Sequence, residues 1–529
     1  MEQKTLNSGS EEALDQGSLP GRKKLKDLLF VFLVGTGAFS LRWLPTFLAW
    51  LKRGDKIFLG ANSLINPVDI WVYWGGVLQG KVGYFLSADI YGSRGQEGLL
   101  LKMFYLSFGH LGRFLNLKVE VAYLVGSYLG TLLLAYAYYK LSSLLFRDTF
   151  WRHLAFLVAL AGKPFLLRLP DEAYSAASFF ILNFPHYIFD HLGIVTIIYL
   201  FLRENQPSKK LLIWGLLAGF LLGLGHFFMG WLVLFLLAAT MVVLPAFRKR
   251  KNLLLILVVL AAVLTMTLLS FPTLLKSYYG LELTSSAAGT FGLKNLIWPL
   301  VFFVLLALLF LVQGKKRPWL LFFSLAPIFQ LLLILSCPFV WRLRLFNSLL
   351  IPTSFLLIAV SQLIGHQLSG NKTVKKVLFI FLLAYCFVDS FYLLLSEISW
   401  IRDDNPFLYV TQSEAQAWQF LKKRCDFSQV IYADWLRGIY LPAKTGCRSL
   451  IGLKSETPDY KAGVLKQVSI LSGRVNPDNL VDYFIEEGVN YIFLTHLQAR
   501  SANLAAVENL NLLYENEEFV IYEVNSPPG

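Results

Sequence analysis

Long apolar runs recur along this chain, separated by short segments that carry lysine and arginine. Runs such as 253–275, 296–312 and 377–395 carry almost no charge. A helix of that length crosses the ~30 Å hydrocarbon core of a bilayer. The pattern predicts about eleven membrane-spanning helices, at residues 27–50, 119–140, 153–169, 184–203, 210–224, 226–246, 252–274, 295–313, 318–337, 345–367 and 377–398.

The positive charges indicate which ends of these spans face the cytoplasm. Residues 1–26 are polar and end in Arg22-Lys23-Lys24-Leu25-Lys26, which predicts a disordered cytoplasmic tail. The apolar run that follows is too long for a signal-peptide core, so we expect it to remain as the first span. With the N-terminus inside, every strongly basic short loop falls on the cytoplasmic side, as the positive-inside rule requires. These loops contain Lys140, Arg147, Arg152, Lys209, Lys210, residues 248–251, residues 315–317, Lys372, Lys375 and Lys376.

Composition supports this interpretation and excludes others. Hydrophobic residues make up 56% of the 529 positions and charged residues only 16%, whereas soluble domains carry about 25% charged residues. The net charge is +14, yet acidic residues outnumber basic ones after Trp400. The positive excess therefore lies in loops between spans, where membrane topology explains it and a nucleic-acid partner is not needed.

Two segments outside the spans have patterns of their own. In residues 51–118, Asn66-Pro67 predicts a helix start, and 98–117 resembles a helix that lies in the membrane interface. After Trp400, helical patterns at 413–423 and 479–487 alternate with strand-like 429–433 and 489–494, and 511–524 predicts a hairpin. Alternating helices and strands predict a small α/β domain.

The predicted fold is a polytopic α-helical membrane protein with a C-terminal extracytoplasmic α/β domain. Its parts are the tail 1–26, a transmembrane domain 27–399 with a large first outer loop 51–118, and the soluble domain 400–529. We expect it in the plasma (inner) membrane. Four cysteines are too few for a disulfide framework, and whether Cys425 and Cys447 pair in the soluble domain is open.

Asp69 is the strongest candidate for a catalytic residue. It lies among aromatic residues in Asn66-Pro67-Val68-Asp69-Ile70-Trp71-Val72-Tyr73-Trp74. Its carboxylate would accept a proton from a hydroxyl while rings such as Trp71 and Tyr73 stack on a sugar. The alternative is that Asp69 only complements the dipole at a helix N-terminus.

Further acids and one arginine follow in the same outer segment. Asp89 or Glu97 would bind a divalent ion or an acceptor, and Arg94 would bind a phosphate. The spacing matches no specific metal motif, and the glycines between them are also typical of a solvated turn.

Polar residues also mark the outer ends of the third and fourth spans. Asp171-Glu172 and His186 are placed there as substrate ligands, with Asp190 and His191 one turn deeper. Ionisable residues at that depth usually face a cavity or a partner. A purely structural Asp190–His191 network is the alternative.

Arg342 and Arg344 begin the tenth span on the outer side. The planar fork of arginine suits a phosphate or diphosphate. Snorkelling arginines that anchor the helix at the interface are the alternative. Alternate positions on a helix cannot both point inward, so at most one is expected to be a ligand.

No Walker loop, dinucleotide fingerprint, zinc signature or serine-nucleophile elbow occurs in a suitable context. ATP-driven transport is therefore disfavoured.

The chain resembles the GT-C superfamily of membrane glycosyltransferases, in particular an uncharacterised bacterial subgroup. The likeness covers the general plan: a first span, a long outer loop with an early Asp, many further spans and an outer α/β domain. The residues that carry it are Asp69, Tyr73, Gly83-Tyr84-Phe85, Asp89-Ile90-Tyr91, Glu97, Phe104-Tyr105, Gly109, Pro170-Asp171-Glu172, Pro185-His186, Ala433-Asp434-Trp435, Leu441–Gly446 and Thr457-Pro458.

The resemblance implies a reaction and a division of roles. An acidic residue of the first outer loop is the catalytic base in that superfamily, which points to Asp69, with Asp89 or Glu97 next. A basic residue such as Arg342 or Arg344 would contact the phosphate of a polyprenyl-linked sugar donor, and the acceptor would be a glycan, lipid or protein. The first loop lacks an Asp-Asp or Asp-Glu doublet and the tail lacks an oligosaccharyltransferase signature. The reaction subclass and any need for a divalent cation are therefore open.

The leading hypothesis is a glycosyltransferase that works at the extracytoplasmic face. One rival is a transporter or flippase of a lipid-linked glycan, and another is a non-catalytic membrane scaffold. A transporter needs a polar path that both faces can reach, but the acids lie almost wholly in the predicted outer segments.

Overall fold

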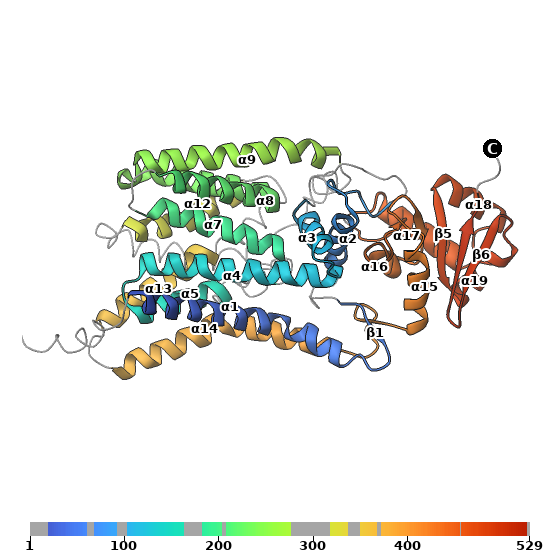
Figure 1. The fold of residues 1–529 in the computed structure, drawn as a ribbon, viewed down its shortest axis with the longest axis horizontal. Coiled ribbons are helices and arrows are strands. Elements are labelled where there is room, and N and C mark those ends of the chain that lie inside the picture. The colour runs from blue at the N-terminus through green and yellow to red at the C-terminus, as the bar shows by residue number, and fades with distance from the viewer. Residues whose placement is uncertain are drawn as a thin grey trace, which may run out of the picture.

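A computed structural model describes residues 20–60, 68–92, 103–162, 182, 184–203, 208–276, 318–336, 350–367, 372–454 and 456–525. Long helices form a bundle at one end of the molecule, and a sheet flanked by helices forms the other end (Figure 1). Helices α2 (Asp69–Val82) and α3 (Met103–Phe114) lie between these two parts. The segment predicted as the first outer loop therefore separates the bundle from the C-terminal unit.

The bundle helices match the predicted spans that fall on described residues. Large apolar side chains such as Leu29, Leu133 and Leu268 are exposed on their outer surface, as expected where helices face lipid. The helices are α1 (Pro20–Leu51), α4 (Val119–Leu145), α5 (Thr149–Ala161), α7 (Pro185–Leu202), α8 (Lys209–Val243), α9 (Arg250–Lys276), α12 (Pro318–Ser336), α13 (Leu350–Gln367) and α14 (Lys372–Ser399), with a short 3₁₀ turn at Pro245–Phe247.

The described helices support a multi-pass membrane protein without confirming the number of spans. Within the described ranges, 5 helices are long and apolar enough to cross a membrane, or 6 if the bent pair Phe379–Val388 and Ser390–Ser399 is one span. Shorter apolar helices lie at Thr149–Ala161, Phe228–Val243 and Ile351–Leu363. The predicted span 295–313 lies outside the described residues, so the total of eleven stays a prediction.

Helix α8 contains both spans predicted at 210–224 and 226–246. Its backbone leaves helical geometry at His226, with φ −143° and ψ 96°. Gly223 packs on Met266 of α9, whereas Gly230, which comes later in α8, packs on Val263, which comes earlier in α9. The chain therefore reverses at His226, and both arms of α8 run along α9 and α7. The predicted boundary between the two spans, after residue 224 and before residue 226, lies next to this break in the helix.

A buried ion pair joins the first and last helices of the bundle. The guanidinium of Arg42 in α1 binds both carboxylate oxygens of Glu397 in α14, and both side chains are at most 2% exposed. Two-point binding by arginine satisfies both charges in a place where either alone would be costly. The pair fixes α1 beside α14 at the end of the bundle near the C-terminal unit.

The C-terminal unit is built on a five-stranded sheet with the strand order β4-β3-β5-β7-β6. Strands β3, β4 and β5 are parallel, and β7 runs antiparallel to both β5 and β6. The helices and strands predicted in this region are confirmed with small shifts of their ends. The elements are β2 (Tyr409–Val410), α15 (Gln412–Lys422), β3 (Val430–Tyr432), α16 (Trp435–Thr445), β4 (Arg448–Ser449), α17 (Tyr460–Leu471), α18 (Pro477–Glu486), β5 (Val489–Thr495), α19 (His496–Ser501), a 3₁₀ turn Leu504–Ala506, β6 (Leu510–Glu515) and β7 (Phe519–Val524).

Three links tie the C-terminal unit to the rest of the chain. Strand β1 (Ile57–Phe58), which follows α1, pairs antiparallel with β2. The outer segment after α2 pairs with the edge strand β4 through Tyr91 and Ser449, with Gly92 N–H donating to Ser449 O at 2.8 Å and Ser449 N–H donating to Ile90 O at 2.9 Å. Cys425 and Cys447 form a disulfide, which answers the question that the sequence left open.

Candidate functional site

Helix α2 presents different side chains to the bundle and to the C-terminal unit. It begins at Asp69, so this residue is the first of the helix and its carboxylate lies at the positive end of the helix dipole. The predicted start at Asn66-Pro67 lies outside the described residues. Asp69 and Tyr73 are one turn apart and share one face of α2. On this face, the ring of Tyr73 points toward the bundle. Trp71 faces the C-terminal unit.

On the bundle side, Tyr73 lies within a group of aromatic rings. Its ring stacks on Tyr105 of α3 with 4.5 Å between centroids. It also lies 5.0 Å from the ring of His186 and 6.0 Å from that of Phe184, both at the start of α7. Three segments that are distant in sequence therefore meet one turn from Asp69.

His186 is the polar centre of this group. Its Nδ1 forms a short hydrogen bond with the hydroxyl of Tyr105, and its ring is 6% exposed in the folded chain. The ring of Tyr187 lies 4.2 Å away and the ring of His226 lies 5.1 Å away. His226 comes from the turn in α8, so the start of α7 and the turn of α8 converge where His186 was predicted to line a site.

Asp190 lies one turn deeper and pairs with His226. Its Oδ2 is 2.5 Å from His226 Nδ1, and a Cβ atom on Gly225 would overlap its Oδ1. His191 instead bonds the hydroxyl of Tyr138 at 3.1 Å. Asp190 and His191 therefore have separate partners and do not form the network that was the alternative to a site, because successive residues of a helix point in different directions. Asp190 holds the turn of α8 next to His186.

The opposite face of α2 docks the C-terminal unit. Trp71 is fully buried, and its ring lies 5.9 Å from that of Tyr440 in α16. The amine of Lys444 lies 5.4 Å from the Trp71 ring and 5.1 Å from the Trp74 ring, and it binds Glu120 Oε1 of α4 at 3.0 Å. Burial lowers the pKa of Lys444, although Glu120 acts in the opposite direction. In this packing Trp71 contributes to docking, and its predicted contact with substrate stays a prediction.

Replacing Lys444 with methionine is expected to loosen the C-terminal unit from α2 and α4. The variant keeps the apolar stem but loses the ion pair and the cation–π contacts, which contribute about 2 kcal/mol when desolvated. We expect a lower melting temperature and faster proteolysis between α14 and α15. The exposed Lys461 offers a matched Lys461→Met control. Equal melting and proteolysis of the two variants would contradict the docking role.

Asp89 lies in the segment that joins α2 to the C-terminal unit. The carboxamide of Gln79 fixes this segment by bonding both N–H and C=O of Ala88, at 3.0 and 2.9 Å. Asp89 is buried, and its Oδ1 accepts the N–H of Tyr91 at 3.1 Å. The hydroxyl of Tyr91 donates to Ile439 O at 2.7 Å. These bonds place Asp89 in a rigid connection rather than in a solvated loop.

The negative charges of three carboxylates act on the buried hydroxyl of Tyr91. Burial raises the pKa of its hydroxyl well above the usual range, and the negative charges of Glu456, Asp89 and Asp69 raise it further. These oxygen donors have the chemistry that Mg²⁺ or Mn²⁺ prefers. However, no group of three or more His, Cys, Asp or Glu side chains is close enough to hold a metal within the described ranges. The described acids therefore do not form a metal site.

The structure brings together one part of the predicted site. Asp69, Tyr73 and His186 lie around the junction of α2, α3 and α7, and Asp89 lies in the segment that follows α2. The remaining predicted residues lie outside the described part of the chain: Arg94, Glu97, Asp171, Glu172, Arg342 and Arg344.

Tyr105, Lys444 and Glu456 were not predicted as residues of this region's site, although Tyr105 and Lys444 fall in stretches that carry the family resemblance. Tyr105 lies in an aromatic stretch, which is a weak signal for a site. Lys444 is a single cation among apolar residues of α16, a pattern that also suits a snorkelling surface lysine. The charge of Glu456 acts on Tyr91, which pairs with Ser449 of β4, and no local pattern predicts that pairing.

No known family model matches this sequence, and no curated protein matches it. The fold, by contrast, matches solved structures. ArnT from Cupriavidus metallidurans, bound to undecaprenyl phosphate, has a TM-score of 0.50 and 12% identity, covering 96% of this chain and 99% of that chain. The archaeal oligosaccharyltransferase AglB from Archaeoglobus fulgidus, in complex with an inhibitory peptide and a dolichol-phosphate, has a TM-score of 0.50 and 12% identity, covering 95% and 74%.

The arabinofuranosyltransferase AftD from Mycobacteria has a TM-score of 0.53 and 13% identity, and the match covers 97% of this chain and 40% of AftD. At such low identity the likeness concerns the fold alone. It extends over almost the whole chain, including the outer segment and the C-terminal unit. The chain is therefore a multi-pass membrane protein with the GT-C-like fold of membrane glycosyltransferases.

Proposed function

We propose that the protein is a membrane glycosyltransferase that moves a sugar from a polyprenyl-phosphate donor to an acceptor hydroxyl. The observation that supports this most is the position of Asp69. The residue begins α2 at the junction of the bundle and the C-terminal unit, next to the aromatic and histidine side chains at the ends of α3 and α7. A base at such a junction can meet a lipid-borne donor from one side and a polar acceptor from the other.

In the proposed reaction, Asp69 accepts the proton of the acceptor hydroxyl while the oxygen attacks the anomeric carbon. The bond from that carbon to the phosphate oxygen breaks, and polyprenyl phosphate leaves with the electron pair. We expect Tyr73 and the ring of His186 to hold the sugar by stacking and hydrogen bonding. We retain Arg342 or Arg344 as the expected phosphate ligand. No step is assigned to a metal.

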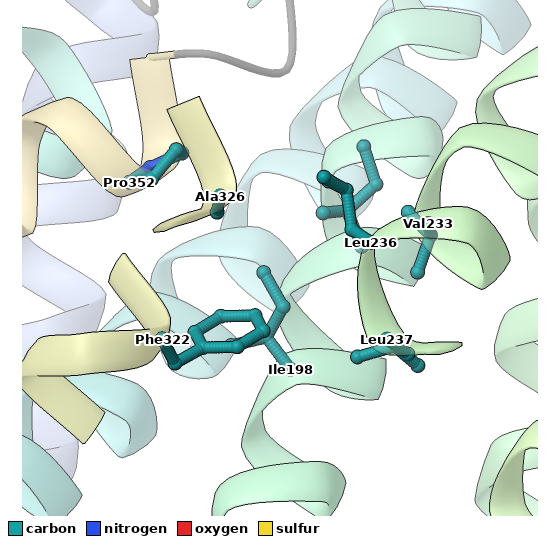
Figure 2. A pocket seen from close by; sticks show the side chains of 8 residues that line it. Ile198, Val233, Leu236, Leu237, Phe322, Ala326 and Pro352 are labelled. Atoms are coloured by element: carbon teal, nitrogen blue, oxygen red, sulfur yellow. The ribbon is translucent and has the colours of Figure 1, made fainter. Parts of the chain in front are cut away.

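A small apolar pocket lies deeper in the bundle, between α7, α8, α12 and α13. We propose that the isoprenoid chain of the donor lies against this apolar part of the bundle. Figure 2 shows Phe322, Ile198 and Leu236 beside this space. Ile194 and Ile198 follow His186 by two and three turns of α7, so the pocket begins roughly 12 Å below the polar group. Its lining is entirely apolar: Ile194, Ile198, Val233, Leu236, Leu237, Phe322, Ala326 and Pro352.

We also propose that the C-terminal unit faces the extracytoplasmic side. The basic loops between spans support this orientation through the positive-inside rule. The disulfide between Cys425 and Cys447 adds support, because such bonds persist in oxidising compartments. The acceptor would then be a glycan, lipid or protein of the cell envelope.

The experiment that tests this function measures release of polyprenyl phosphate. The purified chain in nanodiscs is given a panel of polyprenyl-phosphate sugars together with envelope glycans, lipids and peptides as acceptors, and the lipid product is followed by mass spectrometry. This product is the same whatever the acceptor. We expect release from one or a few donors, and none with heat-unfolded protein. Movement of an intact donor between leaflets of proteoliposomes without its cleavage would favour the transporter hypothesis and contradict the proposal.

A further inference from the structure

The C-terminal ends of α2 and α3 form an exposed apolar surface beside the bundle. The two ends pack together, since the ring of Phe85 stacks on His110 at 4.8 Å and Gly83 lies against the guanidinium of Arg113. Phe85 is 78% exposed and Phe114 is 86% exposed. We call this surface the α2–α3 tip and define it as Val82, Phe85, Leu86, Phe114 and Leu115, all of which are exposed.

This tip continues the surface that α4 presents to lipid. Phe114 and Leu115 precede the start of α4 by only a few residues, at the end of the bundle near the C-terminal unit. Val121, Leu129 and Leu133 of α4 are also exposed. A bundle helix that spans the bilayer turns such side chains toward acyl chains. The tip therefore lies at the level where hydrocarbon meets the polar head groups.

Basic residues predominate around the tip, and of the two acids close by in the described part of the chain, Glu120 pairs with Lys444 while Asp426 lies on the side of the C-terminal unit. Lys81 lies in the last turn of α2, Arg113 lies in the last turn of α3, and Lys118 is the N-cap of α4. Residues 81–86 and 103–119 contain no Asp or Glu. Aromatic side chains together with basic ones are typical of segments that bind the interface of anionic membranes.

The C-terminal unit already covers one side of this region. The hydroxyl of Tyr84 donates to Asp426 O at 3.0 Å, and the Tyr84 ring lies 5.9 Å from Phe427. The tip side chains remain exposed despite this contact. Their continuity with the outer surface of α4 and the surrounding positive charge both favour lipid over a protein partner.

We propose that the α2–α3 tip inserts into the membrane interface, where Lys81, Arg113 and Lys118 bind the phosphates of anionic phospholipids. The interaction anchors α2 at the end opposite Asp69. The backbones of α2 and α3 contact each other directly at Gly80 and Gly109. Binding of the tip to lipid therefore fixes the depth of both helices relative to the membrane. This inference is independent of the sugar-transfer reaction.

The insertion is tested by attaching a fluorescent label to the tip and measuring whether lipid-borne or aqueous quenchers reach it. A Phe114→Cys variant of the full chain, with Cys337→Ser and Cys386→Ser, carries a bimane label in nanodiscs that contain acyl-chain-brominated lipid. Val468→Cys on α17 is the matched control, because Val468 is an exposed apolar residue of the C-terminal unit. We expect strong quenching of the Phe114 label by brominated lipid, and quenching of the Val468 label by aqueous iodide only.

Two outcomes would overturn the insertion. One is that iodide quenches the label of the Phe114→Cys variant as strongly as it quenches the label of the Val468→Cys variant. The other is a Phe114 label that neither quencher reaches, because a second copy of the chain or another protein would then cover the tip.

The anionic preference is tested by the phospholipids that the purified protein retains. Wild-type protein taken from vesicles of phosphatidylglycerol and phosphatidylcholine is expected to retain excess phosphatidylglycerol. Arg113→Gln combined with Lys118→Gln is expected to reduce this excess by roughly fivefold per charge removed. Lys454→Gln combined with Lys461→Gln is the charge-matched control on exposed residues of the C-terminal unit. Equal retention by both double variants would refute the anionic site.

Discussion

Replacing Asp69 with asparagine is expected to lower the turnover of sugar transfer by roughly 10²–10⁴-fold, the usual contribution of a general base. Asparagine has nearly the same shape and still places an oxygen at the start of α2, but it cannot accept the proton of the acceptor. The donor should bind with unchanged affinity because the rings of Tyr73 and His186 remain. The measurement is kcat for release of polyprenyl phosphate, together with the dissociation constant of the donor.

Two variants serve as controls for this result. Asp404→Asn changes an exposed acid in the segment that follows α14 and should behave as wild type. Asp89→Asn keeps an oxygen that can accept the N–H of Tyr91, so the segment around it should stay folded. Turnover of Asp69→Asn within about twofold of wild type would exclude Asp69 as the base. Loss of turnover in Asp89→Asn alone would move that role to Asp89.

Replacing Gly109 or Gly80 with alanine is expected to separate α2 from α3 and to reduce both stability and activity. A Cβ atom on Gly109 would overlap the carbonyl oxygen of Val77, and one on Gly80 would overlap that of Leu106. Backbone atoms cannot rotate away, so the helices must move apart. Such overpacking costs about 1–3 kcal/mol, and a shift of about 1 Å at a reacting group lowers rates by roughly 10²-fold.

The measurements for these variants are the melting temperature and kcat. Gly37 in α1 provides the control, because a Cβ atom there meets nothing within 4 Å. Gly37→Ala should melt and react as wild type. If Gly109→Ala and Gly80→Ala also matched wild type, the close contact of α2 with α3 would not be what positions Asp69.

The parts of the fold that depend on local pattern were predictable. Apolar runs indicated the bundle helices, and even the reversal at His226 fell between two predicted spans. The strands β3 and β5 followed from short apolar runs beside helical patterns. The short strands β1 and β4 did not: β1 is held by β2, far away in the chain, and β4 lies between β3 and the distant Tyr91. A strand of 2 residues carries no periodicity of its own.

The candidate site was predictable only in its residue types. An acid among aromatic residues marked Asp69 and Tyr73, and a histidine at the end of a span marked His186. The sequence did not indicate that Tyr105 forms a hydrogen bond with His186, or that Asp190 pairs with His226 rather than with its neighbour His191. Those choices depend on helix rotation and on the turn of α8, and both are set by tertiary packing.

The pairing of Tyr91 with Ser449 has a consequence for how the protein is made. The outer segment that leaves α2 emerges early in synthesis, whereas β4 belongs to the last part of the chain. Until the ribosome has released β4 and β5, the segment that carries Asp89 has no sheet edge to join and Trp71 has no helix to cover it. The nascent bundle therefore has an uncovered end at α2 until synthesis is complete, and we expect a chain truncated after α14 to insert in the membrane but to lack the proposed sugar transfer.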